Sequence, residues 1–474
     1  MNKYKISDFF IYKRRNLIGY ILVAVGLIAT LVFIGLFLPG GITNQEIQSV
    51  LKSNSIYVLK YWSMDVVNLP YHLLQHTSFH FFGVSIFSVK LPSIILAFLS
   101  ALGLILLLRQ WFKTNIAVLA SLIAITTSQF LFIAQNGTSD ILYLFWPVWI
   151  ILFASLIPTM KKFRKLFIAA FFILATLSLY TPLSIYVILV IVGAIAIHPH
   201  LRYLIKHLSR SELINGIIIA LILISPLMYA IYKAPSLCFT LLGFPSTWPN
   251  IGSNLSSLFN QYFSFANTGG TTMMTPFFEL GSVMLIALGA YFVIKNRFTA
   301  KNYLVILWII CLIPIIILNP NYTTITLLPL VLLLASGLNG LLAQWYELFP
   351  RNPYARIGGL IPVVILVTAL VFSGINRYVY EYRYSPNMVS NFNKDLLLIP
   401  PKTNNLVVSD NEMPFYQVVS KYNKKLIVST MPISDTFLAT RAAKESIIGY
   451  QISKIITSSA YFNSDRLYVY NKNQ

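Results

Sequence analysis

The run LPSIILAFLSALGLILLLRQWF, residues 91–112, contains a single charged residue, Arg109. A helix needs about 20 predominantly apolar residues to cross the hydrocarbon core of a bilayer, so this run predicts a membrane-spanning helix. Its composition recurs along the chain, which is 57% hydrophobic and 10% charged over 474 residues. Soluble domains average about 25% charged residues. The composition therefore excludes a soluble enzyme and predicts a polytopic α-helical membrane protein.

Similar apolar runs predict about eleven spans. The first is longer than the apolar core of a signal peptide, so we expect it to be retained. Tyr180-Thr181-Pro182 separates two short runs, which we interpret as two spans because one merged span would put the basic segments on either side of it on opposite faces. The predicted spans are residues 16–38, 91–112, 116–136, 140–158, 166–179, 183–197, 214–232, 277–296, 303–319, 323–346 and 357–376.

Lysine and arginine concentrate on one set of the predicted loops, for example KRR at 13–15 and KKFRK at 161–165. Cytoplasmic loops carry such an excess, so we expect a cytoplasmic N-terminus and an extracytoplasmic C-terminus. This arrangement accounts for most of the net charge of +21. The charge therefore does not indicate nucleic acid as a partner. The apolar runs are rich in isoleucine, and the C-terminus has no retention signal, which together favour a bacterial plasma membrane. The lipid bilayer of that membrane is then a partner of the protein.

The composition changes after residue 376. Short runs that alternate between strand-like and helix-like patterns favour a small α/β domain. The predicted domains are a transmembrane domain, 1–376, with its first outer loop at 39–90, and an extracytoplasmic α/β domain, 377–474. In the second domain, strands are predicted at 405–410, 424–430, 454–459 and 466–471, and helices at 413–422 and 434–451.

Acidic residues are scarce, and four of them lie on the predicted outer side. Glu46 and Asp65 fall in the first outer loop, whereas Asp140 and Glu279 each open a span. Carboxylates near the membrane are costly, so a functional role is the first hypothesis. For Asp140 and Glu279 the alternative is a favourable interaction with the dipole of the helix that each one begins.

Three histidines in the first outer loop follow one another at intervals of four residues. His72, His76 and His80 therefore share one face of a predicted helix. This face could bind a divalent metal, with His72 and His76 nearest to the loop carboxylates. The alternative is a polar stripe at the membrane interface.

Three segments occur in an order that resembles a known family. They read NLPY at 68–71, FFGVSIFSVKLPS at 81–93 and AQNGTSDILYLFW at 134–146. The set resembles the GT-C glycosyltransferases of the protein O-mannosyltransferase and lipid A aminoarabinose transferase type, over about residues 16–200. The chain departs from the family at two places. Gln45 stands where the family has the Asp of its D-E pair, and the Arg of its R-x-x-x-D motif is absent.

The resemblance implies a GT-C-like fold and a reaction. A sugar on a polyprenyl phosphate moves to an acceptor hydroxyl of a protein, glycan or lipid outside the cytoplasm. A carboxylate acts as general base; Glu46 is the favoured candidate, Asp65 is the second, and a member without either base is the remaining alternative. Asp140, in the segment that resembles the family's R-x-x-x-D motif, is a further candidate catalytic residue. Cations offset the charge that develops on the leaving phosphate. The candidates for this role are Lys60, Lys90, Lys233 and Arg377.

Two other classes of protein fit parts of the pattern. A transporter or lipid flippase would also be polytopic, but such proteins place ionisable residues near mid-membrane, often in repeated halves. The predicted spans here are almost free of charge and show no repeat. A non-catalytic envelope assembly protein that binds partners through its C-terminal domain is the other alternative, because the family's usual Asp is missing.

Overall fold

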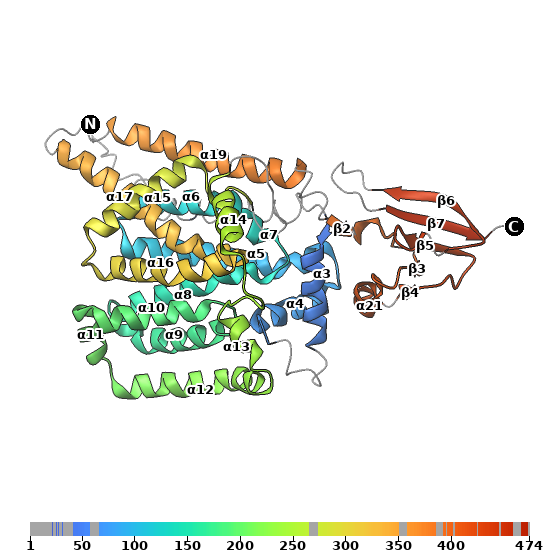
Figure 1. The fold of residues 1–474 in the computed structure, drawn as a ribbon, viewed down its shortest axis with the longest axis horizontal. Helices are drawn as coiled ribbons and strands as arrows, with labels where there is room; N and C mark the ends of the chain where they lie inside the picture. Colours follow the sequence, from blue (N-terminus) through green and yellow to red (C-terminus); the bar gives the residue numbers. More distant parts are fainter. Residues whose placement is uncertain are drawn as a thin grey trace, which may run out of the picture.

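The structure is a computed structural model. It describes residues 41–56, 66–264, 274–349, 358–384, 392–394, 396–401, 403–423, 425–444, 447–457 and 466–472. Of the first predicted span it describes only residues 21, 25, 27 and 31. A helical bundle forms one end of the elongated molecule and a small sheet domain forms the other (Figure 1).

The ten predicted spans after the first all coincide with helices. Their sequences are apolar on most faces, as expected for helices that pack both on each other and on lipid. The bundle consists of α5 (Ile86–Trp111), α6 (Thr114–Thr126), α7 (Ser128–Gln135), α8 (Leu142–Leu156), α9 (Arg164–Ser178), α10 (Ser184–Ile197), α11 (Pro199–Lys206), α12 (Arg210–Lys233), α15 (Leu280–Lys295), α16 (Ala300–Leu318), α17 (Leu327–Leu348) and α19 (Leu360–Tyr384). The last of these continues past the predicted domain boundary at residue 376.

Not every one of these helices is long enough to cross a membrane. Among the described residues, six helices are long and apolar enough to cross a membrane, and up to eight spans result if each bent pair is counted as one span. The pair α6 and α7 bends by 60° at Thr127, and the pair α10 and α11 bends by 97° before Pro199. Helices α9 and α15 have 15 and 16 residues. The chain is thus a multi-pass membrane protein with fewer full-length spans than the apolar runs predict.

Helices α15 and α17 pack closely through glycines. A Cβ atom on Gly289 would collide with the carbonyl oxygen of Leu333, and one on Gly337 would collide with that of Leu285. Small residues allow helix backbones in a membrane to approach this closely. The two glycines therefore fix the contact between these helices.

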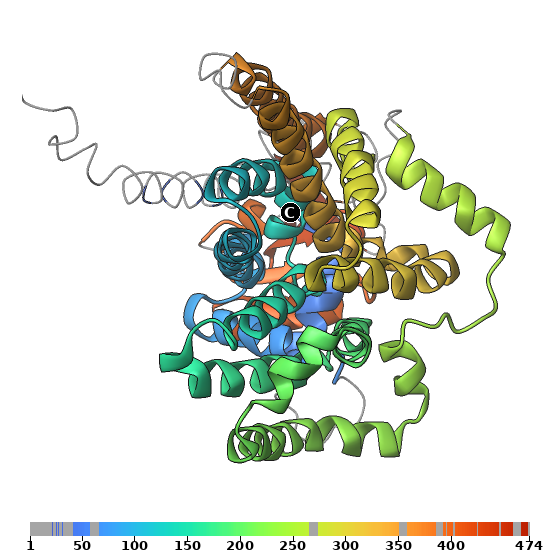
Figure 2. The same ribbon diagram turned by 90° about the vertical axis from the view of Figure 1, so that its left-hand side faces the viewer.

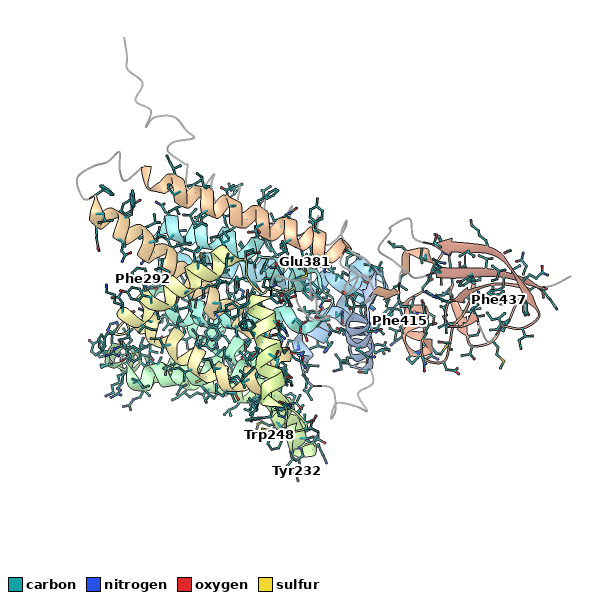
Figure 3. The ribbon with its side chains drawn as sticks, turned by 45° about the horizontal axis from the view of Figure 1, so that its top comes forward. Tyr232, Trp248, Phe292, Glu381, Phe415 and Phe437 are labelled. Carbon is teal, nitrogen blue, oxygen red and sulfur yellow. The ribbon has the colours of Figure 1, made fainter. Side chains whose placement is uncertain are left out.

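The segment between α12 and α15, predicted as a large outer loop at 233–276, contains two more helices. They are α13 (Ser236–Leu241) and α14 (Ile251–Phe263). Tyr232 and Trp248 both lie at the lower edge of the molecule in the view of Figure 3, with 80% and 81% of their surface exposed. Exposed tyrosine and tryptophan are typical of a membrane–water interface.

The first outer loop joins the bundle to the C-terminal domain. Strand β1 (Ile42–Thr43) pairs antiparallel with β2 (Phe392–Lys394). Helices α3 (Asn44–Ser55) and α4 (Leu69–Phe82) follow. Val50 and Phe79 of these helices share one buried apolar cluster with Phe415 and Val419 of the C-terminal domain. Because this core is common to both parts, the domain is held against the outer loop.

The C-terminal domain is a five-stranded mixed sheet with one helix, α21 (Met413–Tyr422). The strands lie in the order β4 (Ile427–Ser429), β3 (Asn405–Val407), β5 (Thr436–Thr440), β7 (Arg466–Lys472), β6 (Tyr450–Thr457). Strand β3 is parallel to β4 and β5, whereas β7 is antiparallel to β5 and β6. The small α/β domain expected from the sequence is therefore present.

The predicted helix at 434–451 is wrong. Its first part forms β5, the central strand of the sheet, and its last residues begin β6. Four of the five residues of β5 are buried because β3 and β7 flank it. A short apolar run cannot be assigned to helix or strand by periodicity alone, and here pairing with two neighbouring strands decides the outcome.

Candidate active site

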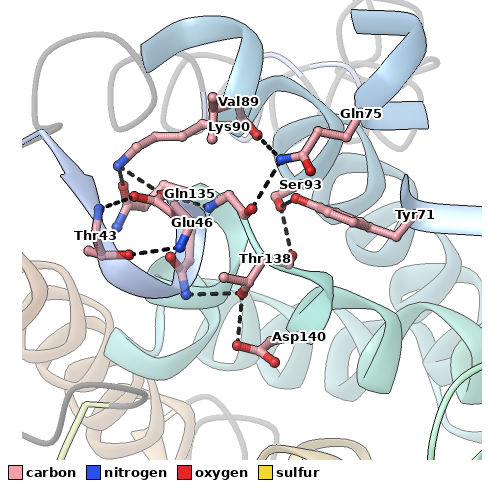
Figure 4. A network of polar contacts seen from close by, with 12 residues as sticks. Thr43, Glu46, Tyr71, Gln75, Val89, Lys90, Ser93, Gln135, Thr138 and Asp140 are labelled. Atoms are coloured by element: carbon pink, nitrogen blue, oxygen red, sulfur yellow. Dashed lines mark hydrogen bonds and ion pairs between the residues drawn. The ribbon is translucent and has the colours of Figure 1, made fainter. Parts of the chain in front are cut away.

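A network of polar side chains lies at the end of the bundle that faces α3, α4 and the C-terminal domain (Figures 1 and 4). Helix α5 begins here, and so does α8 after the short 3-10 helix η3 (Ser139–Ile141). The segment that links α7 to η3, residues 136–138, runs through the network. Helices α3 and α4, the start of α5 and the continuous segment 136–142 therefore meet at one place.

An ion pair between Glu46 and Lys90 forms one side of the network. The Lys90 Nζ atom lies 3.4 Å from Glu46 Oε1, and neither residue has measurable exposed surface. Lys90 Nζ also donates a hydrogen bond of 3.1 Å to Gln135 Oε1. A buried charge is tolerated only when it is paired and hydrogen-bonded. Each member of this pair therefore depends on the other.

The Glu46 carboxylate accepts two backbone hydrogen bonds in addition. Oε1 accepts from the Gly137 N–H at 2.7 Å, and Oε2 accepts from the Thr43 N–H at 2.9 Å. The second bond is half of a capping box, because the Thr43 hydroxyl accepts from the Glu46 N–H in return. Glu46 thus fixes the start of α3 and attaches it to the segment that precedes η3.

Gly137 is required by this arrangement. A Cβ atom at this position would lie 2.6 Å from Val89 Cγ1 and 3.1 Å from Glu46 Oε1. Any larger residue would therefore displace either the start of α5 or the carboxylate. The absence of a side chain allows the Gly137 N–H to reach Glu46.

Gln75 ties the remaining elements together. Its Nε2 donates to the carbonyl oxygens of Val89 and Gly137 at 3.0 and 3.2 Å. Its Oε1 accepts from the hydroxyls of Ser49 and Ser53 at 2.8 and 2.6 Å. All four bonds are buried, so Gln75 has its full hydrogen-bonding capacity satisfied. No pattern in the sequence indicated this residue, because an isolated glutamine on an amphipathic helix is usually exposed.

Asp140 differs from Glu46 in its surroundings. It lies in η3 and is partly exposed. Among the described residues, only the Thr138 hydroxyl donates a hydrogen bond to its carboxylate, at 2.9 Å to Oδ2. Nearby, the rings of Tyr143 and Tyr322 meet edge to face, with their centres 6.0 Å apart. The other oxygen of the Asp140 carboxylate, Oδ1, accepts no hydrogen bond from the described residues and is free to receive a proton.

Asn68 and Tyr71 extend the network towards Asp140. Asn68 has left-handed backbone geometry, with φ of 59°, which asparagine tolerates better than most residues. Its Nδ2 donates to the Ser139 hydroxyl at 2.7 Å, whereas its Oδ1 is buried with no hydrogen-bond partner among the described residues. The Tyr71 hydroxyl bonds Ser93 Oγ at 2.8 Å, and burial raises the pKa of Tyr71 far above its usual range. The signal for Asn68 was its place in the Asn-Leu-Pro turn.

The other predicted site residues lie apart from this network or outside the described residues. Asp65 and Lys60 are outside the described residues. Lys233 is exposed at the end of α12, 5.8 Å from the ring centre of Tyr229. Arg377 forms an ion pair of 2.8 Å with Glu381 on the same helix.

Glu279, the fourth outer carboxylate, is the residue before α15, and its side chain makes no capping hydrogen bond. It is buried, and its Oε1 atom has no hydrogen-bond partner among the described residues. Its Oε2 atom accepts from the Ser282 hydroxyl at 3.5 Å, and its place at the start of α15 is the one that the helix-dipole alternative requires.

The two histidines proposed as metal ligands have different partners. His72 Nδ1 lies 2.8 Å from Ser53 Oγ, and His76 Nδ1 lies 3.2 Å from the Tyr422 hydroxyl of the C-terminal domain. Burial, and to a lesser extent the charge of Lys52, lowers the pKa of His72 to about 4. Within the described parts of the chain, no three His, Cys, Asp or Glu residues are grouped as metal ligands.

The chain is similar to known proteins in sequence and in fold. The model of a family described as dolichyl-phosphate-mannose-protein mannosyltransferase matches residues 70–229, which include most of the network. The structure of ArnT from Cupriavidus metallidurans bound to undecaprenyl phosphate is similar with a TM-score of 0.58 and 11% identity, over 96% of this chain and 98% of that one. The fold is that of a GT-C glycosyltransferase. The apo form of the same ArnT gives a TM-score of 0.56 over the same shares of both chains, also at 11% identity.

The GT-C fold also extends to more distant structures. The archaeal oligosaccharyltransferase AglB from Archaeoglobus fulgidus, in complex with an inhibitory peptide and a dolichol-phosphate, gives a TM-score of 0.51 at 13% identity. That match covers 89% of this chain and 65% of AglB. A search of curated proteins finds no match.

Proposed function

We propose that this protein is a membrane glycosyltransferase that moves a sugar from a polyprenyl-phosphate donor to an acceptor hydroxyl. The reaction takes place at the end of the bundle that carries α3, α4 and the C-terminal domain, which we place outside the cytoplasm. The observation that carries the proposal is the partly exposed Asp140 within a GT-C fold; Thr138 holds its Oδ2 atom, and its Oδ1 atom accepts no hydrogen bond from the described residues. Relatives of that fold bind undecaprenyl phosphate and dolichol-phosphate.

Asp140 is the proposed general base. The acceptor O–H proton passes to the Asp140 carboxylate while the acceptor oxygen attacks the anomeric carbon of the sugar. The bond between that carbon and the phosphate oxygen breaks, and the polyprenyl phosphate leaves with the electron pair. A base must come within hydrogen-bond reach of the proton it removes. The partly exposed Asp140 meets this requirement more readily than the buried Glu46, and Asp65 remains the second candidate.

Glu46 is the proposed positioning residue. Backbone N–H groups engage both of its oxygens, and Lys90 also engages one of them. The residue is fully buried, so a substrate hydroxyl has no direct access to the carboxylate. Its bond to Gly137 holds the segment that leads directly to Asp140. Misplacement of a reacting group by about 1 Å can cost about 100-fold in rate, which gives this connection a catalytic consequence.

Cations for the leaving phosphate are proposed at Lys60 and Lys233. Lys90 and Arg377, the other two candidates, are each paired with a carboxylate. Ala230, which precedes Lys233 on α12, shares an apolar cluster with Val66. This contact brings the end of α12 near the outer loop, on the same side of the bundle as the network.

The proposal is tested by Asp140→Asn in membranes that contain the full chain and labelled polyprenyl-phosphate hexoses and pentoses. Loss of a general base slows proton transfer by about 100- to 10,000-fold, so we expect sugar transfer to fall by that factor. Asp410→Asn is the matched control, because Asp410 is an exposed carboxylate of the C-terminal domain. Wild-type transfer by Asp140→Asn would remove Asp140 as the base, and loss of transfer in Asp65→Asn alone would assign the role to Asp65.

A further inference from the structure

A cavity of about 490 Å³ lies at the end of the bundle opposite the candidate active site. Trp111 at the end of α5 and Pro158 beyond α8 line it, together with residues of α9, α10, α11, α12 and the start of α16. Figure 2 views the molecule from this end, with α12 at the edge of the bundle. The volume falls within the range of about 300–1,000 Å³ that is usual for small-ligand sites.

The wall of the cavity is almost entirely apolar. Helix α11 contributes Leu201, Leu204 and Ile205 to the lining, whereas Arg202 and Lys206 of the same helix are exposed. A helix with one apolar and one basic face lies along the interface of a membrane. The bend of 97° between α10 and α11 is consistent with this position.

The charge at the mouth of the cavity is positive. Lys301 and Arg164 both line it, and no acidic residue is present among the described lining residues. The Arg164 guanidinium is paired with Glu212 at 3.2 Å. Lys301 Nζ donates to the Trp111 carbonyl oxygen at 3.2 Å and lies 4.4 Å from the ring centre of Phe112. The Lys301 Nζ atom therefore lies beside the apolar interior.

We propose that this cavity binds an anionic diacyl phospholipid of the leaflet that faces this end of the bundle. An acyl chain occupies the apolar interior, and the phosphate of the headgroup lies between Lys301 and the basic face of α11. An apolar interior that opens beside a lysine and an interfacial basic helix matches a lipid with one anionic group and a long apolar chain. A soluble anion or a sugar would leave the apolar wall without a partner.

The site is independent of the proposed transferase activity, because it is at the opposite end of the bundle from Asp140. It is tested on the purified full chain by native mass spectrometry, after addition of equal amounts of dioleoyl-phosphatidylglycerol and dioleoyl-phosphatidylcholine. We expect one phosphatidylglycerol molecule to be retained in preference to phosphatidylcholine. Lys301→Gln, which keeps a hydrogen-bond donor, should reduce that preference about fivefold, the effect of losing one basic residue near an anionic surface.

Filling the cavity provides a second test. Ala154→Phe places a ring in the lining of the cavity and should abolish retention of the phosphatidylglycerol. Leu166→Phe on the exposed face of α9 and Lys295→Gln at the same end of the bundle are the matched controls, and both should bind as the wild type does. Size-exclusion chromatography checks that each variant is folded.

Three results would overturn the proposal. One is equal retention of the two lipids by the wild type. Another is unchanged retention of phosphatidylglycerol in both Ala154→Phe and Lys301→Gln. Displacement of phosphatidylglycerol by undecaprenyl phosphate would instead assign the cavity to the donor lipid.

Discussion

Removing the charge of Glu46 should destabilise the protein strongly. Glu46→Gln keeps the shape of the side chain but removes the negative charge that lies 3.4 Å from the buried Lys90 Nζ atom, and places an amide group next to backbone N–H donors. Breaking a buried ion pair by removing one partner costs about 3–5 kcal/mol. Domains are commonly stable by only about 5–15 kcal/mol, so the loss is a large fraction of the free energy of unfolding.

A double-mutant cycle measures the interaction directly. Lys90→Met should cost less than Glu46→Gln, because the carboxylate keeps both of its backbone hydrogen bonds. The combined variant should be more stable than the sum of the single effects predicts, by about 2 kcal/mol. Equilibrium unfolding in mixed micelles of detergent and sodium dodecyl sulfate gives each free energy.

The chain supplies a matched control for this cycle. Lys472 and Asp435 are also 3.4 Å apart, but their side chains are 64% and 78% exposed. Exposed pairs contribute little to stability, so Asp435→Asn should leave the free energy of unfolding nearly unchanged. If Glu46→Gln and Asp435→Asn lost the same amount of stability, the buried pair would not have the structural role assigned to it.

Two further predictions concern the same network. The pKa of His72 is about 4 in the folded protein and about 6.5 when unfolded. The contribution of neutral His72 to the free energy of unfolding is therefore complete above pH 6.5 and is lost as the pH falls towards 4, by about 3 kcal/mol in all. His72→Gln should flatten this part of the curve of unfolding free energy against pH, and an unchanged curve would contradict the assignment. Gly137→Ala should destabilise the protein by about 1–3 kcal/mol and slow sugar transfer. Gly358→Ala should do neither, because a Cβ atom at that position has no other atom within 4 Å. Equal unfolding midpoints for the two variants would refute the close contact at Gly137.

The sequence predicted the membrane fold well because hydrophobicity is a local property. Each apolar run after the first coincides with a helix, since a helix in lipid must satisfy its backbone hydrogen bonds within the segment. The number of full-length spans was less predictable. The break at Thr127 lies inside a run that the sequence predicts as one span, whereas the bend before Pro199 comes where the apolar run of α10 ends and the partly basic α11 begins.

The site was predictable only in part. The sequence indicated Glu46, Lys90 and Asp140 as residues of one region, but not that the first two form a buried pair. These two residues are separated by 44 positions, and no spacing rule connects a loop helix to the start of a span. Gln75 gave no signal because its role arises from four partners on three other segments. Strand β5 was missed for a similar reason, since its neighbours in the sheet determine it.

The central claim is that the protein transfers sugar from a polyprenyl phosphate and does not move the intact lipid across the bilayer. Proteoliposomes that contain the wild-type chain and undecaprenyl-phosphate hexoses or pentoses separate the two activities. We predict release of free undecaprenyl phosphate, in an amount equal to the sugar gained by the acceptor, and its loss in Asp140→Asn. Movement of the lipid-linked sugar between leaflets, with no undecaprenyl phosphate released from any donor, would contradict the account.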